Sequence, residues 1–429
     1  MPDERGLTPG EAETESPPMS LPPSTPSPSV ALEPPSTGPS ATRSEALLTP
    51  PFVLMLCVQF CFGLAFSTFF LLPKYLTREF HASSAAIGAV ASIALLSGVI
   101  ATPALGAAID RGARRPAITY GALVNGLCGG AFAWIHSVSL PLYLLRAVHG
   151  VSYALVFNAI VTLAADLAPP KKLGQAIGLC GAAGMLSNAI APAIAERIAD
   201  QRGWGLVFLL AGGAALLAAL LSLFIREPRD ESARPVSEHE LGASALALVR
   251  DPKRAGAFVC AAAAGAAFGA LFTFTQPFAL SLGARQVSGF FVGYTLCALA
   301  VRLFFGGLGD NWGRERVAFA ALVLYGLVAC MTSQLRPSLL FPLGCGLGLA
   351  HGLLYPAINA IGASDVPRAR RGAVMSYFSA CFYGGFALWV FGLGVLAKRS
   401  GYPLVFVLSG VLVWSSIAFL PKGTRRQRA

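Results

Sequence analysis

Residues 149–160 read HGVSYALVFNAI, and residues 351–361 read HGLLYPAINAI. In each stretch His-Gly is followed by a tyrosine and then by Asn-Ala-Ile, within a long apolar run. The likeness between the two halves of the chain extends to further pairs: Asp110 with Asp310, Asp166 with Asp365, Gly174 with Gly372, and Gly203 with Gly401. A half-chain repeat in an apolar sequence predicts two helical bundles of the same orientation with a path between them, an arrangement typical of membrane transporters.

The composition indicates a membrane protein. The chain is 55% hydrophobic and 12% charged, with a mean hydropathy of +0.63, whereas soluble domains carry about 25% charged residues. Apolar runs long enough to span a hydrocarbon core of roughly 30 Å recur along the chain. Backbone groups in lipid must be paired within each segment, so we expect helices. The predicted spans are 50–74, 84–109, 116–136, 139–163, 172–199, 203–225, 253–281, 285–309, 315–334, 337–363, 369–398 and 401–421.

The expected fold is therefore an all-α membrane protein of twelve transmembrane helices in two pseudo-symmetric six-helix bundles. Residues 1–48 differ from the rest, because they hold eleven prolines and seven acids against two arginines. Such a segment predicts a disordered tail without the features of a secretory signal. The predicted organisation is a tail over 1–48, one bundle over 49–225, a linker over 226–252, a second bundle over 253–421 and a basic end over 422–429.

The nine cysteines all fall within predicted spans, and their spacing shows no metal-binding pattern. They are expected to pack between helices as small apolar residues. We therefore expect no metal and no cofactor, and we expect a monomer in the lipid bilayer. The sequence holds no P-loop and no paired aspartates facing the membrane surface, so neither an ATP-driven pump nor a lipid-modifying enzyme is predicted. The expected protein is not an enzyme.

The basic residues are distributed by side of the membrane. Even-numbered connections and the C-terminus hold twenty lysines and arginines, and odd-numbered connections hold eight. The positive-inside rule then predicts that both termini and residues 226–252 are cytoplasmic in an inner (plasma) membrane. The net charge of +11 is thus a sign of topology and does not indicate nucleic-acid binding.

A second repeated element follows the second and eighth predicted spans. The sequences are GAAIDRGARR at 106–115 and GGLGDNWGRER at 306–316. Each places small residues at a helix end, then an acid, then a basic turn; the acid can favour the N-terminus of a neighbouring helix. The expected conformational gate comprises Gly106, Asp110, Arg111, Arg114, Gly306, Asp310, Gly313 and Arg314, with Asp166 and Asp365 as partners of the two arginines at 114 and 314. We expect the two motif aspartates to bridge the bundles on the cytoplasmic side and to lock an outward-open state.

These two copies resemble the loop signature of the major facilitator superfamily, and the resemblance covers residues 50–421, with bacterial drug and metabolite efflux permeases as the similar group. It implies two six-helix bundles and alternating access by a rocking motion. The first copy has Gly112-Ala113 where the superfamily usually has any residue followed by Gly, and the second has Asn311 for the usual basic residue. Arg146, Gly150 and Ala154 are also similar to a superfamily pattern in the fourth helix.

Polar residues within the spans are candidates for the substrate or proton pathway. A charge in a membrane helix costs about 2.5–3.5 kcal/mol on insertion scales, so it normally faces a cavity or a partner. Arg146, His149 and Tyr153 share one helix face, although Arg146 alternatively snorkels to the surface. Arg302 is interpreted as a mid-span charge that reads an anion or pairs across helices. The candidate pathway residues are Arg146, His149, Tyr153, Arg302, His351, Tyr355, Asn359, Gln59 and Gln276, with interhelical hydrogen bonding as the alternative role of each polar group.

The fifth predicted span resembles an antiporter signature of the superfamily, but only Pro192 and scattered small residues match it. Pro192 is expected to kink this helix. Glu196 lies near the outer end of the same span beside Arg197 and is interpreted as a surface acid. No predicted span carries a carboxylate near its centre.

The leading hypothesis is a secondary active transporter that exports a small organic solute in exchange for protons. One alternative is an uptake symporter for an organic anion read by Arg302 or Arg146. Another is a membrane sensor that does not transport, with the acidic tail as its output.

Overall fold

The computed structural model of this chain describes residues 46–110, 114–169, 172–227, 252–305, 312–364, 366 and 371–421. These residues belong to one compact unit. Within them the secondary structure is helical, and no strand is present. The expectation of an all-α fold is confirmed.

The first half holds α1 (Pro50–Thr68), η1 (Phe69–Leu71), α2 (Leu72–Phe80), α3 (Ser84–Asp110), α4 (Arg114–Ala131), η2 (Phe132–Trp134), α5 (Leu140–Leu167), α6 (Leu173–Arg202) and α7 (Trp204–Ser222). The second half holds α9 (Pro252–Ser281), α10 (Ser288–Phe304), α12 (Arg314–Thr332), η4 (Pro337–Leu339), α13 (Leu340–Gly362), α14 (Arg371–Ser400), α15 (Tyr402–Ser416) and η6 (Ile417–Phe419).

Ten of the described helical segments are long and apolar enough to cross a membrane. α10 is a shorter apolar helix, and α4, which begins with two arginines, is not among the ten. The membrane fold is thus confirmed, whereas the count of twelve spans is not fully confirmed.

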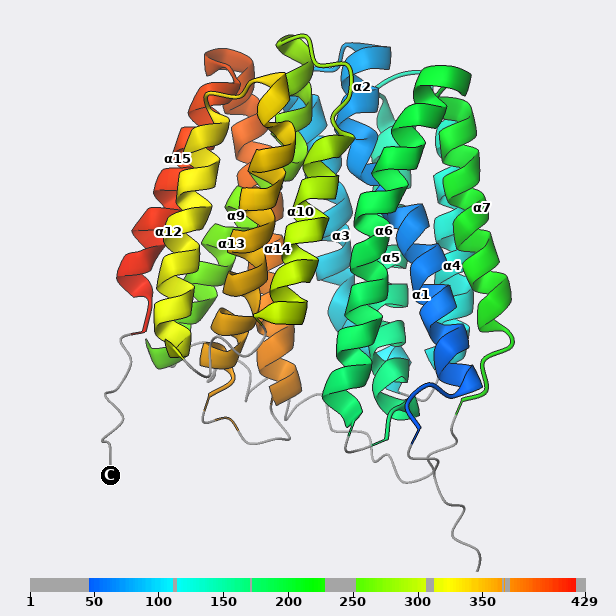
Figure 1. Ribbon diagram of the computed structural model, residues 1–429. Helices are drawn as coiled ribbons and strands as arrows, with labels where there is room; N and C mark the ends of the chain where they lie inside the picture. Colours follow the sequence, from blue (N-terminus) through cyan, green and yellow to red (C-terminus); the bar gives the residue numbers. More distant parts are fainter. Residues whose placement is uncertain are drawn as a thin grey trace, which may run out of the picture. The chain divides into compact units, whose positions relative to one another are not determined.

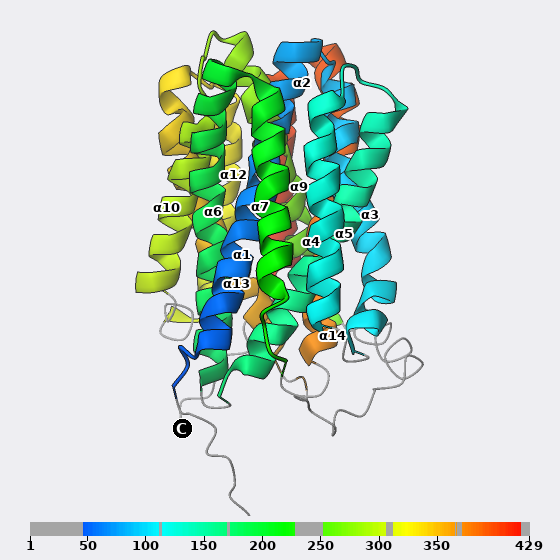
Figure 2. The same ribbon diagram turned by 90° about the vertical axis from the view of Figure 1, so that its right-hand side faces the viewer.

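Helices of each half pack mainly on one another, and two helix pairs provide most of the packing between the halves. α3 packs along α14, and α6 packs along α10. Figure 1 shows the first half, in blue to green, beside the second half, in lighter green to red, with α3 and α14 adjacent between them. The same lengthwise packing is visible after a quarter turn in Figure 2. α2 lies at one end of the molecule, here named the α2 end, and α1 begins at the opposite end.

The first membrane segment is a broken helix, and proline explains the break. Pro73 has no N–H to donate to the Phe69 carbonyl. The Leu72 N–H donates to that carbonyl instead, in the tighter 3₁₀ pattern of η1. The helix then resumes as α2 and ends at Phe80, followed by His81 in the left-handed region with φ 48°. The segment therefore extends six residues beyond the predicted end at residue 74, which places Lys74 inside a helix.

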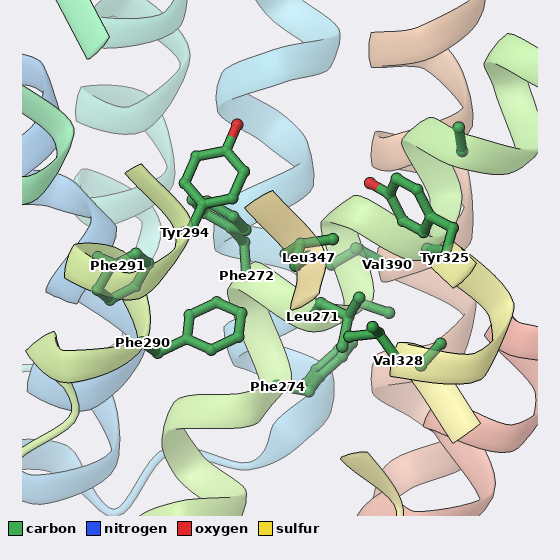
Figure 3. Close-up of a cluster of buried hydrophobic side chains, with 14 of the residues drawn as sticks. Leu271, Phe272, Phe274, Phe290, Phe291, Tyr294, Tyr325, Val328, Leu347 and Val390 are labelled. Carbon is green, nitrogen blue, oxygen red and sulfur yellow. The ribbon is translucent and has the colours of Figure 1, made fainter. Parts of the chain in front are cut away.

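The second half contains a dense aromatic core. Phe272 of α9 contacts Phe290, Phe291 and Tyr294 of α10 at ring-centroid distances of 5.8, 5.3 and 5.0 Å. Figure 3 shows these rings gathered with Leu347 of α13. Edge-to-face arrangements of this kind add to the apolar burial that holds the helices together.

Glycines allow the repeated His-Gly elements to approach neighbouring helices closely. A Cβ on Gly150 of α5 would overlap the backbone carbonyl of Ala94 in α3. The adjacent Ser97 hydroxyl donates to the Ala147 carbonyl at 2.9 Å, which fixes the same contact. A Cβ on Gly352, the counterpart in α13, would lie 3.0 Å from the Val301 side chain of α10. The glycine of each repeat is therefore required by helix packing.

Replacing Gly150 with alanine is expected to destabilise the protein by about 1–3 kcal/mol, because the added methyl group overpacks the contact between α3 and α5. The matched control is Gly130→Ala in α4, where an added Cβ meets nothing within 4 Å. Thermal unfolding in detergent should show a lower midpoint for Gly150→Ala only. Equal midpoints for the two variants would contradict the close approach.

Candidate functional site

The two halves place equivalent rings over their repeated histidines. Phe66 of α1 stacks on His149 of α5 at 6.0 Å, and Phe268 of α9 lies 4.9 Å from the ring of His351 in α13. The structure thus brings α1 against α5 and α9 against α13 at the same point of each half. The sequence repeat corresponds to a structural one.

Arg146 is buried, with 7% of its surface exposed, so the snorkelling alternative is wrong. Its Nη1 donates to His149 Nδ1 at 3.0 Å, and its guanidinium lies 5.8 Å from the centre of the Phe69 ring. Its Nε lies 3.5 Å from the Val90 carbonyl of α3. Among the described residues no carboxylate pairs with it, so its charge is held by an aromatic face and by weak acceptors.

The contact with Arg146 fixes the chemistry of His149. A guanidinium only donates, so Nδ1 accepts and the ring proton of a neutral imidazole lies on Nε2. That atom is buried and has no hydrogen-bond partner among the described residues. The His149 side chain is fully enclosed. His149 therefore has one unused N–H donor, on Nε2, in a ring that is stacked against Phe66.

His351 occupies the equivalent place in the second half. Its ring lies 5.5 Å from that of Tyr355 and 5.6 Å from that of Phe382 in α14. Its Nδ1 is buried without a hydrogen-bond partner among the described residues. His351 also lines a small recess. The recess is formed by Ala261, Ala264, His351, Leu354, Tyr355, Ile358, Phe378 and Phe382.

Tyrosines of the two halves lie near one another, and we name Tyr153, Tyr294, Tyr355 and Tyr383 the aromatic centre. Tyr153 stacks on Phe66 at 3.7 Å, and both side chains are half-buried. The hydroxyl of Tyr383 in α14 is close enough to interact electrostatically with those of Tyr153, Tyr294 and Tyr355. Tyr153 and Tyr355 were candidates from the sequence, whereas the sequence analysis missed Tyr294 and Tyr383.

Asn359 does not continue the polar stripe as a free amide. Its Nδ2 donates to the Tyr355 carbonyl one turn earlier in α13, at 2.9 Å. Its donor is therefore used within the helix.

Arg302 lies in the last turn of α10, because this helix ends at Phe304. The prediction that it lies mid-span is wrong: the span was drawn to residue 309 on apolar composition alone. Its side chain is exposed, and its Nη1 lies 3.2 Å from the position of a Cβ built on Gly181 in α6. It makes no ion pair or hydrogen bond with a described residue. It lies within electrostatic range of His351 and Tyr294.

The two glutamines differ in role. Gln276 of α9 donates through Nε2 to the Phe70 carbonyl at 2.7 Å, which joins the halves at the break in the first helix. Its buried Oε1 has no partner among the described residues. Gln59 of α1 is also buried and packs its amide against Gly184 of α6. Gln276 thus makes a contact between the two bundles, whereas the contact of Gln59 lies within the first bundle.

The α2 end holds a charged cluster that the sequence analysis did not find. Lys74 Nζ lies 2.5 Å from Glu196 Oε1, and the two side chains are 0% and 1% exposed. Lys74 also donates to the Arg285 carbonyl of the second half at 3.0 Å. The interpretation of Glu196 as a surface acid is therefore wrong.

Glu196 crosses to the second half and caps α10. The backbone N–H of Val287 donates to Oε1 and that of Ser288 donates to Oε2, both at 2.8 Å. The first N–H groups of a helix have no partner within it, and a carboxylate there is also favoured by the helix dipole. The α2 end is thus closed by a carboxylate of α6 bound to the N-terminus of α10.

Weaker contacts surround this cluster. Asp200, one turn further along α6, lies 3.8 Å from Lys74 Nζ and 3.6 Å from Arg78 Nη1. Arg78 Nη2 also donates to the Arg285 carbonyl at 3.1 Å. About one third of each of these two side chains is exposed, and such pairs contribute about 0–1 kcal/mol. We name the set Lys74, Arg78, Glu196, Asp200 and the Arg285–Ser288 backbone the α2-end latch.

Serines close the seam between α3 and α14. Ser84 donates to the Gly394 carbonyl at 3.0 Å, and Ser92 donates to the Ala387 carbonyl at 2.7 Å. A Cβ on Gly88 would lie 2.7 Å from the Val390 carbonyl. The halves therefore contact each other closely along this seam as well.

Part of the predicted gate is described. Arg114 Nε lies 2.8 Å from Asp166 Oδ2, so this expected pair is present. The Arg115 N–H donates to Glu227, which caps α4 in the manner expected of the motif acid. Gly106 lies in α3 and Asp110 ends it, while Gly313, with φ 90°, precedes Arg314 at the start of α12. Outside the described residues lie Arg111, Gly306, Asp310 and Asp365.

Pro192 lies inside α6, which continues from Leu173 to Arg202. The kink expected there stays a prediction. In the turn before it, Asn188 Oδ1 accepts from the Ser67 hydroxyl at 2.7 Å, which ties α6 to α1.

Comparison with known proteins identifies the family. Residues 55–300 and 278–428 match the Major Facilitator Superfamily. The chain belongs to this superfamily, and it is a multi-pass membrane transporter.

Two similar proteins are named as drug exporters. The chain is 26% identical over 344 residues to the multi-drug resistance efflux pump PmrA of Streptococcus pneumoniae, covering 77% of this chain and 84% of that protein. It is 26% identical over 356 residues to the multidrug resistance protein MdtG of Enterobacter lignolyticus, covering 80% and 83%.

Solved structures share the fold. The nucleoside transporter NupG superposes with a TM-score of 0.72 at 15% identity, covering 87% of this chain and 100% of that one. A bacterial homologue of the lysosomal transporter Spinster superposes with a TM-score of 0.68 at 16% identity, covering 89% and 97%.

Removing one member of the buried pair is expected to destabilise the protein strongly. Lys74→Met leaves the Glu196 carboxylate buried without its counter-charge, which costs about 3–5 kcal/mol. The control is Arg78→Met, which removes an exposed ion pair and an exposed hydrogen bond to the Arg285 carbonyl and should cost about 1 kcal/mol. Thermal unfolding in detergent compares the two. A loss for Lys74→Met no larger than that for Arg78→Met would contradict the burial of the pair.

Proposed function

We propose that this protein exports small organic molecules by alternating access and that proton movement drives the export. The observation that carries the proposal is the pair of equivalent half-sites, with Phe66 over His149 in one bundle and Phe268 over His351 in the other. The names of the similar proteins support export.

The side chains of the aromatic centre and the nearby Arg302 indicate a class of substrate. The half-buried rings of this centre, such as Tyr153 and Tyr355, suit flat apolar molecules. Arg302 supplies a guanidinium that no described carboxylate neutralises. The substrate class that fits is therefore an aromatic molecule that is neutral or anionic. The same arginine favours the second candidate function, uptake of an organic anion with a coupled ion.

The orientation proposed here follows the distribution of basic residues. With both termini and residues 226–252 in the cytoplasm, the α2 end faces outward, and the structure is closed on the outside. Reporter fusions at Glu240 and Ala429 test this orientation, because a cytoplasmic reporter should be active at both positions.

Export is tested with inside-out membrane vesicles and a panel of labelled aromatic solutes. Vesicles that contain the protein should accumulate one or more solutes when the interior is acidified, and dissipating the proton gradient should abolish the accumulation. Vesicles without the protein are the control. Accumulation only in right-side-out vesicles would contradict export and support the uptake symporter.

The role of Arg302 is tested by changing its shape and then its charge. Arg302→Lys keeps the charge and loses the planar fork that binds a carboxylate through two hydrogen bonds. Arg302→Gln loses both. We expect transport of an aromatic carboxylate to fall about tenfold or more in Arg302→Gln, a loss of about 1.4 kcal/mol, and less in Arg302→Lys.

The corresponding neutral amide should be transported almost as well by both variants as by the parent protein. Arg336→Gln, which changes an exposed arginine in the connection before η4, serves as the matched control. Equal losses of transport for the carboxylate and the amide would show that Arg302 does not recognise the charge of the substrate.

A further inference from the structure

Glu196 is bound on both of its carboxylate oxygens. Oε1 accepts from Lys74 Nζ and from the Val287 N–H, and Oε2 accepts from the Ser288 N–H. The lysine belongs to the first half, and both N–H groups belong to the second. One buried side chain thus holds the two bundles together at the α2 end.

This arrangement fits a carboxylate and does not fit a carboxylic acid. All three partners are donors, and none accepts a hydrogen bond in this geometry. A proton on either oxygen therefore faces a donor, and the helix N–H beside it loses its acceptor. The buried Lys74 ammonium also loses its counter-charge.

The charged groups around Glu196 are few among the described residues. Lys74 of α2 makes direct contact, and Asp200 and Arg78 lie at the exposed rim. On the α10 side only backbone groups of Arg285, Val287 and Ser288 meet these side chains. A proton on Glu196 thus leaves Lys74 with Asp200, at 3.8 Å, as its remaining anion.

Asp200 cannot perform the same role. Its two ion-pair partners, Lys74 and Arg78, both lie in α2 of its own half. Protonation of Asp200 weakens contacts within one bundle, whereas protonation of Glu196 breaks contacts between bundles. Only the second event separates the halves.

We propose that Glu196 is a proton-binding site that controls opening at the α2 end. A proton from the solution at that end binds Glu196 Oε2, the Ser288 and Val287 N–H groups exchange the carboxylate for water, and α10 moves away from α6. When the end closes, the proton returns to the same solution. Glu196 therefore senses acidity and sets the conformational equilibrium, and it does not carry protons across the membrane. The proposal rests on the alternating access proposed above.

The test measures distances between spin labels on the two bundles, without substrate. Labels at Ser137 and Gln334, exposed in the connections after η2 and α12, report on the α2 end. Labels at Gln175 and Arg316, exposed near the starts of α6 and α12, report on the opposite end. All are introduced into protein from which the nine native cysteines have been removed.

The pH is lowered stepwise from about 8 to about 4, the range in which carboxyl groups ordinarily bind a proton. Over this range the fraction of molecules with a long distance between Ser137 and Gln334 should rise severalfold, while the distance between Gln175 and Arg316 shortens. A distribution that does not change with pH would overturn the proposal.

Variants assign the response to one carboxyl group. Glu196→Gln keeps the shape and places an amide donor against the Ser288 or Val287 N–H, so the α2 end should stay open at every pH. Asp200→Asn, the matched control one turn away, should keep the pH response of the parent protein. A parent-like response in Glu196→Gln would overturn the assignment.

Lys74→Met gives an independent reading if Glu196→Gln does not fold. Without the ammonium the buried carboxylate is less stable, so the midpoint of opening should move to higher pH. An unchanged midpoint in Lys74→Met would also overturn the proposal. The distances are measured without transport, so failure of the export assay leaves this test intact, and a pH-independent distribution leaves the export assay intact.

Discussion

The buried contact of Glu196 with Lys74 and with the N-terminus of α10 is the constraint on which the arrangement of the two bundles depends. Burying a carboxylate and an ammonium is costly, and only nearly complete hydrogen bonding offsets the cost. Here the partners come from both halves, so the cost is offset only when the halves are together. The contact is therefore complete only when the halves are together, which is the property that a gate requires.

Other features of the structure follow from the same contact. Lys74 reaches Glu196 because the first membrane segment continues as α2 after the 3₁₀ turn at Pro73. Within that turn the Phe70 carbonyl accepts a hydrogen bond from Gln276 of the second half. The break in the first helix thus creates two contacts between bundles. Further along the first half, Phe66 stacks on Tyr153 and on His149.

The sequence predicted the features that depend on composition and repetition. Long apolar runs predicted an all-α membrane fold, and the His-Gly repeat predicted equivalent places for His149 and His351. The pair of Arg114 with Asp166 followed from acids and bases at adjacent helix ends. These features are encoded locally or by internal symmetry, so a single sequence is enough to find them.

The latch was not predicted because it depends on tertiary position. Lys74 and Glu196 lie near the ends of apolar runs, where charged residues are usually exposed, and their pairing spans 122 positions of sequence. Arg302 was placed too deep because apolar composition continues past Phe304, where α10 ends. The local sequence indicates the latch only weakly: Lys74 and Glu196 each lie inside the end of an apolar run, just before a more polar connection.

The most direct test of the closed α2 end is a reversible cross-link across it. Cysteines replace Arg78 and Arg285 at the rim of the latch, where the Arg78 guanidinium reaches the Arg285 carbonyl, in protein without native cysteines. A bifunctional thiol reagent with a cleavable spacer then joins them. The account predicts that the cross-link stops transport, that cleavage of the spacer restores it, and that each single-cysteine variant is unaffected by the reagent. Continued transport with the cross-link fully formed would show that the α2 end does not open during the cycle, and it would contradict the account.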